Sequence, residues 1–155
     1  MQVKRALYIL SCLCFFVWWG GFTFYASFVV PTGMKVLGNH VLMGFITERV
    51  SIKLNTACAV AIAISLLYIL WGNATIPRKS KQVMAINLLM MFLLLLSLSF
   101  LHVYMEASLD FEGRKVIEEP HFYFLHRIYL IISSIMWLQG IVHITQLLNI
   151  RIEQK

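Results

Sequence analysis

Four long apolar runs constrain this chain more than any other feature of its sequence. Each run holds the roughly 20 residues that a helix needs to cross a hydrocarbon core about 30 Å thick. Backbone N–H and C=O groups find no water in hydrocarbon, so four such runs predict an all-α four-helix transmembrane bundle. The expected spans, within a single transmembrane domain over residues 1–155, are about 7–30, 50–71, 83–104 and 122–148.

The charged residues between the runs indicate an orientation. Basic residues precede the first run, separate the second from the third and follow the fourth: Lys4, Arg5, Arg78, Lys79, Lys81, Arg151 and Lys155. Acidic residues dominate the connection from 105 to 121, against Arg114 and Lys115: Glu106, Asp110, Glu112, Glu118 and Glu119. The positive-inside rule then predicts cytoplasmic termini and a cytoplasmic 72–82 loop, with 31–49 and 105–121 outside.

This distribution also explains the net charge of +6. The basic residues flank the runs instead of forming one patch, so they indicate topology and not nucleic-acid binding. We expect an integral membrane protein, with the lipid bilayer and other membrane subunits as its partners.

The connection between the first two runs has a helical pattern of its own. Leu37, Val41, Leu42 and Phe45 recur at helical spacing. A helix from residue 38 to 71 would be about 50 Å long, more than one untilted crossing requires. We therefore predict a short interfacial helix here, turning near Gly44.

Polar residues within the runs form stripes at spacings of three and four. One stripe holds Glu48, Ser51, Asn55 and Cys58, and another holds His126, Tyr129, Ser133, Trp137 and Gly140. Polar groups are costly in a membrane and usually pair across helices, which predicts an intramembrane network of Glu48, Asn55, Arg127, Tyr129 and Ser133. Arg127 has two interpretations: an ion pair with Glu48 or Glu106, or a guanidinium that extends to the interface.

Four of the five histidines cluster toward the predicted outer side: His40, His102, His121 and His126. His102 ends one run and His126 begins another, so both are expected at a similar depth, and Glu106 lies one turn beyond His102. Imidazoles on two helices suit haem b as a pair of axial ligands, and together with carboxylates they suit a transition metal. The alternative is that they are solvated or make ordinary polar contacts. His143 is expected to be a lone interfacial histidine.

Several short segments carry a family resemblance. Trp19-Gly20-Gly21-Phe22, the stretch 44–47 and Leu125-His126-Arg127-Ile128-Tyr129 resemble small bacterial four-helix membrane proteins, which are distantly similar to the transmembrane-protein-205 family. The resemblance covers the first 55 residues and the start of the last run. It implies a four-span bundle, which we expect in the bacterial inner (cell) membrane. No catalytic residue can be carried over from it.

The sequence says less about function than about architecture. The sequence shows no nucleophile–base pair, no Gly-rich phosphate loop and no paired catalytic carboxylates. The leading hypothesis is a non-enzymatic multi-pass membrane protein, an accessory or structural subunit of a membrane complex. The alternative is a haem- or metal-binding protein for electron transfer or metal handling that uses the outer histidines.

Overall fold

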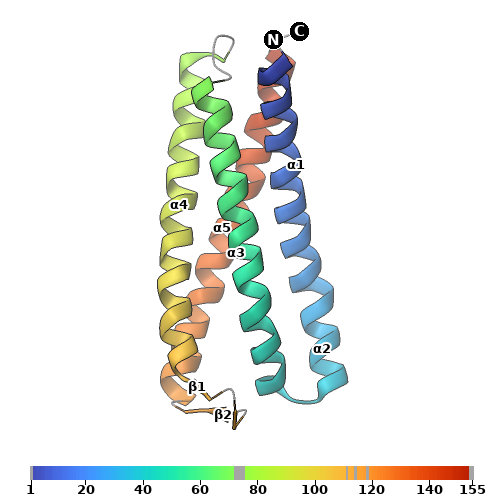
Figure 1. The fold of residues 1–155 in the computed structure, drawn as a ribbon, viewed down its shortest axis with the longest axis vertical. Coiled ribbons are helices and arrows are strands. Elements are labelled where there is room, and N and C mark those ends of the chain that lie inside the picture. Colours follow the sequence, from blue (N-terminus) through green and yellow to red (C-terminus); the bar gives the residue numbers. More distant parts are fainter. Residues whose placement is uncertain (1, 72–75, 111, 114, 118, 154–155) are drawn as a thin grey trace.

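The computed structural model is an all-α bundle of four long helical segments (Figure 1). It describes residues 2–71, 76–110, 112–113, 115–117 and 119–153. Arg114, Glu118 and Lys155 of the charge argument lie outside the described residues, as does part of the 72–82 loop. All four segments are long and apolar enough to cross a membrane, which confirms the predicted fold class and an integral membrane protein.

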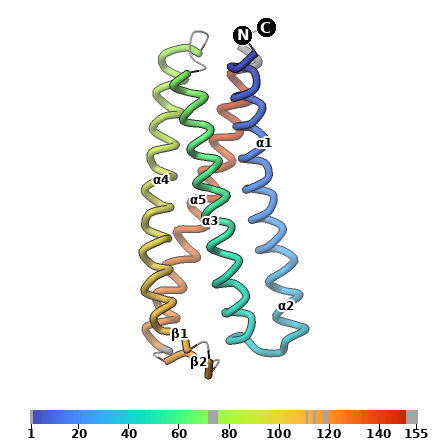
Figure 2. Tube along the Cα trace, in the orientation of Figure 1, coloured from blue at the N-terminus to red at the C-terminus, as the bar shows by residue number. Residues whose placement is uncertain are grey.

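The first segment is one continuous helical path with a local change of winding. It consists of α1 (Gln2–Phe24), the π-helical turn η1 (Tyr25–Val29) and α2 (Val30–Leu37), traced in Figure 2. The first run was expected to end at about residue 30, but the helix continues through Pro31, which lies in the first turn of α2 directly after the π-helical turn. The segment ends at Gly38, whose φ of 59° is left-handed and favours glycine.

The predicted separate interfacial helix is wrong. Residues 40–49 are the first turns of α3 (His40–Trp71), a continuous helix of 32 residues. Asn39 starts it, because its side-chain Oδ1 accepts hydrogen bonds from the N–H groups of Val41 (2.8 Å) and Leu42 (3.2 Å). The helix is about 48 Å long at 1.5 Å per residue, so it extends beyond a hydrocarbon core or crosses it tilted.

The other two spans are of similar length, at 30 and 35 residues. They are α4 (Arg78–Ala107), which starts after Pro77, and α5 (Glu119–Glu153), which has Pro120 in its first turn. Between them lies a short antiparallel hairpin of β1 (Leu109–Asp110) and β2 (Lys115–Val116). The Asp110 carboxylate shapes its turn by accepting hydrogen bonds from the N–H groups of Glu112 and Gly113.

The four segments form a closed ring, in which α1 packs on α3 and α5, and α4 packs on the same two helices. Both termini lie at one end of the bundle, and the hairpin and the α2–α3 turn lie at the other (Figure 1). The buried core includes Phe15, Trp18, Met91, Leu98 and Met136. Other large apolar side chains, such as Val17 and Phe100, point outward, as expected where lipid is the solvent.

Candidate functional site

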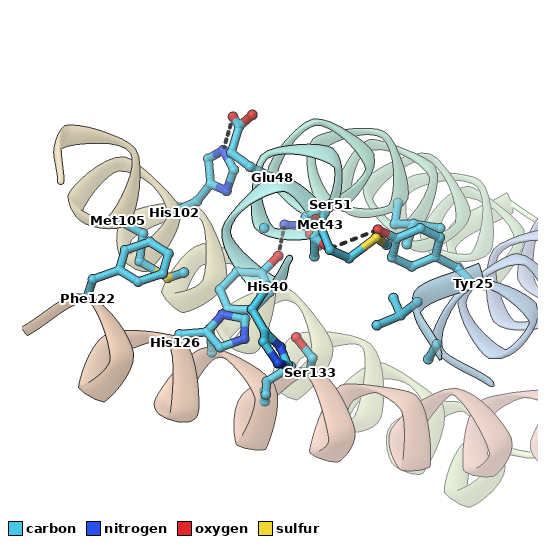
Figure 3. A pocket seen from close by; sticks show the side chains of 18 of the residues that line it. Tyr25, His40, Met43, Glu48, Ser51, His102, Met105, Phe122, His126 and Ser133 are labelled. Carbon is cyan, nitrogen blue, oxygen red and sulfur yellow. Dashed lines mark hydrogen bonds and ion pairs between the residues drawn. The ribbon is translucent and has the colours of Figure 1, made fainter. Parts of the chain in front are cut away.

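A cavity of about 460 Å³ lies within the hairpin end of the bundle. Every span contributes to its wall, and Figure 3 shows side chains entering it from opposite sides. Most of the wall is apolar or aromatic. The polar residues that line it are Tyr25, His40, Thr47, Glu48, Ser51, Asn55, His102, His126, Tyr129 and Ser133. An apolar cavity with a few convergent polar groups is the usual form of a small-molecule site.

Two of the predicted stripes meet in this cavity. Glu48, Ser51 and Asn55 line it from α3, since residues three and four apart share a helix face. Tyr129 lines it from α5, and the Asn55 amide donates to the Tyr129 hydroxyl at 3.1 Å. This bond links two helices whose partner residues are 74 positions apart in the chain.

A second cross-helix bond fixes the π-helical turn. The Tyr25 hydroxyl donates to the Thr47 hydroxyl oxygen at 3.1 Å, while Thr47 donates to the carbonyl of Met43 in its own helix. Tyr25 therefore holds η1 against α3 at the wall of the cavity.

At one edge of the cavity, α3 and α4 bring together Glu48, His102 and Glu106. One ligand atom from each side chain lies within 4.8 Å of the others. The Glu48 side chain is only 6% exposed, and its Oε1 lies 3.3 Å from Nε2 of His102. Figure 3 shows the imidazole directed at this carboxylate.

Glu48 also forms an ion pair with a neighbouring side chain that is largely exposed. Its second oxygen lies 3.0 Å from Nε of Arg49, whose side chain is 64% exposed. Within the part of the chain that the structure describes, no hydrogen bond of good geometry is made by either carboxylate oxygen of Glu48 or by Nε2 of His102. A buried carboxylate is costly unless it is paired, hydrogen-bonded or bound to a metal.

The remaining predicted ligands lie apart from this cluster. His126 lines the cavity from α5, and its ring stacks on Phe122 with centroids 6.1 Å apart. His40 also lines the cavity, whereas His121 is exposed and does not line it. Because Nε2 of His102 faces Glu48, the geometry favours a carboxylate–histidine cluster over a haem held between His102 and His126. The haem site stays a prediction.

Arg127 does not take part in the intramembrane polar network that the sequence predicted. It is exposed, and Glu48 forms its ion pairs with Arg49 and His102 instead. Of the two interpretations of Arg127, the exposed side chain agrees with a guanidinium that reaches the interface.

A second polar cluster, at the end that carries the termini, was missed. The Ser11 hydroxyl donates to Ser65 at 2.8 Å, and Ser65 Oγ lies 2.6 Å from Nε2 of His143. All three residues are fully buried, so the expectation of a lone interfacial His143 is wrong. The stripe of α5 continues from Gly140 to His143 at a spacing of three, which was the available signal.

The sequence showed no nucleophile–base pair, but this cluster contains a contact of that kind. Ser65 and His143 are a hydroxyl and an imidazole in hydrogen-bond contact, an arrangement that the sequence alone did not reveal. Neither residue lines a described cavity, and both are inaccessible. Their geometry therefore supports a link between helices and carries no catalytic assignment.

A groove of about 320 Å³ runs along the contact between α1 and α5. Trp137 lies in its wall and donates from its indole Nε1 to the Thr23 hydroxyl at 2.8 Å. Its ring stacks on Trp19 with centroids 5.3 Å apart. The groove and the cavity share the wall residues Phe22 and Ala26.

Comparisons with protein-family models, curated proteins and solved structures found no match for this chain. The site must therefore be interpreted from its own chemistry.

Proposed function

We propose that this multi-pass membrane protein binds a divalent transition metal through Glu48, His102 and Glu106. The observation that carries the proposal is the convergence of three ligand atoms from two helices within 4.8 Å, one of them on a buried carboxylate. The hypothesis of metal handling thus rests on His102 and Glu106, with Glu48 added from the predicted polar network.

The donor set narrows the choice of metal. Imidazole suits Zn²⁺, Fe²⁺ and Cu²⁺, and carboxylates suit harder ions such as Mn²⁺, so the mixed set fits Zn²⁺, Fe²⁺ or Mn²⁺. A divalent ion would give the Glu48 carboxylate a second cationic partner beside Arg49, whose side chain is largely exposed. Three protein ligands would leave a position open toward the cavity.

Zinc binding to the purified protein tests this proposal. After treatment with a chelator, the wild-type protein in detergent should bind one equivalent of Zn²⁺ by calorimetry. Glu48→Gln and His102→Ala should each weaken binding by about 10-fold or more, since each removes one ligand. Glu112→Gln, an exposed acidic position in the hairpin, is the matched control and should bind as wild type.

Two results would contradict the site. One is an unchanged zinc affinity in both ligand variants while their helical circular dichroism is retained. The other is a Soret band in protein purified from its native membrane, lost in His126→Ala, which would restore the haem alternative.

The wider role that we propose is non-enzymatic: an accessory or structural subunit of a complex in a bacterial inner membrane. Support comes from the apolar outer face of α1, where Leu13 and Val17 are exposed. Such a face suits lipid or a partner helix. Purification from native membranes in mild detergent should then yield co-purifying membrane proteins, and a lone monomer would contradict the subunit role.

Kinship with the transmembrane-protein-205 family likewise remains a proposal.

A further inference from the structure

The cavity and the groove are neighbouring spaces along the contact between α1 and α5, because Phe22 and Ala26 line both. A ligand that occupied both would follow a path along α5 from Phe122 to Leu138, about 24 Å at 1.5 Å per residue. That length suits a compact head group at the hairpin end and an extended tail toward the middle of the bundle.

The walls of this path reach the surface that faces lipid. Leu130 in the cavity wall is 50% exposed, Leu138 in the groove wall is 55% exposed, and Ala26 at their junction is also exposed. A ligand dissolved in the bilayer therefore has a lateral route between α1 and α5 and does not have to cross water.

The wall of the cavity selects the chemistry of the head group. None of its described residues is Lys or Arg, and Glu48 is buried there. An anionic phosphate head would meet the Glu48 carboxylate, and Arg49, which already pairs with that carboxylate, is not part of the wall, so the electrostatics favour a neutral head. The Tyr129 hydroxyl accepts from Asn55 and keeps its O–H to donate to a neutral oxygen, and Ser133 adds a second hydroxyl.

The apolar part of the wall favours a flat ring. Phe22, Phe122 and Tyr123 contribute aromatic faces, and Met43 and Met105 contribute polarizable thioethers. His126 enters from α5 next to Phe122 and presents a ring nitrogen that can donate or accept.

We infer that this path binds a lipophilic quinone or quinol: a neutral ring with opposed oxygens in the cavity and an apolar tail in the groove. This goes beyond the proposed metal centre. Glu48 and His102 belong to the candidate metal cluster and also line the cavity, so quinone binding is tested with the metal removed.

The test is binding of decylubiquinone to the purified full-length protein in detergent with a chelator present, so that a failed metal site cannot affect the result. Quenching of tryptophan fluorescence reports binding, since Trp137 lines the groove. Ala26→Phe places a ring at the exposed junction without entering the core and should weaken binding by about tenfold or more. Ala59→Phe, the same change at an exposed position of α3, is the control and should bind as wild type.

A second variant separates the head from the tail. Tyr129→Phe removes one hydroxyl from the head-group wall and should weaken binding of the quinone, but not of a dodecyl-chain detergent labelled with a spin probe. Wild-type affinity in Ala26→Phe would overturn the inference. So would equal quenching in Ala26→Phe and Ala59→Phe, or co-purification of a phospholipid that decylubiquinone does not displace.

Discussion

At the scale of single residues, Ser65 connects three of the spans. Its hydroxyl accepts a hydrogen bond from Ser11 of α1 and contacts His143 of α5, so one small side chain on α3 links three spans. All three partners are inaccessible. Lipid offers no replacement partner, so an interrupted chain would leave polar groups unpaired.

Replacing Ser65 should therefore destabilise the bundle. We expect Ser65→Ala to lower the free energy of unfolding by about 0.5–2 kcal/mol, the range measured for hydrogen bonds between membrane helices. Unfolding by SDS titration in mixed micelles, followed by circular dichroism, measures the change. Ser97→Ala is the matched control, because the Ser97 hydroxyl is exposed and bonds only to its own helix. Equal stability of the two variants would show that the buried chain contributes nothing.

At the scale of helices, the close approach of α1 and α5 depends on Gly140. A Cβ at this position would lie 2.7 Å from Cζ3 of Trp18 and 3.2 Å from Cδ1 of Trp19. Trp18 is almost fully buried, so its ring has little room to move. A small residue is thus required where two indoles pack against the α5 backbone.

Two glycine substitutions should consequently have opposite effects. Gly140→Ala should destabilise the bundle by about 1–3 kcal/mol through overpacking. Gly20→Ala should be neutral or stabilise by up to about 1 kcal/mol, because a Cβ there meets nothing within 4 Å and alanine is the better helix former. The same SDS titration compares them, and a Gly140→Ala protein as stable as wild type would contradict the packing described here.

The helical elements also show how far local sequence signals extend. The spacing of Glu48, Ser51 and Asn55 predicted a shared face, and the structure places all three on the cavity. The length argument failed at residues 40–49, because it assumed that a helix must match the hydrocarbon thickness. Asn39 instead starts α3 early, and the helix simply continues.

At the scale of the whole molecule, the arrangement of charge sets an orientation that can be measured. Both termini lie at one end, and the acidic hairpin lies at the other (Figure 1). The positive-inside rule predicts that the end with the termini is cytoplasmic. The candidate metal cluster and the cavity would then open near the outer face.

Cysteine labelling tests this orientation. In a protein whose Cys12, Cys14 and Cys58 are replaced by alanine, Glu112→Cys should react with a membrane-impermeant maleimide in intact cells. Lys79→Cys should react only after the membrane is broken. Both positions flank spans at opposite ends of the bundle, so each is the control for the other. The reverse pattern would invert the topology and move the cavity to the cytoplasmic side.

The sequence by itself determined the number of spans, the helical class and the faces that carry polar residues. Hydropathy accumulates along the chain, and a bilayer has a nearly fixed thickness, so these properties are local and additive. Only the tertiary structure decided that His102 meets Glu48, that Ser65 meets His143 and that Trp18 covers Gly140. Such pairs depend on the rotation and depth of each helix relative to its neighbours. The π-helical turn at Tyr25–Val29 adds a further shift of face within the first span, and packing sets these quantities jointly.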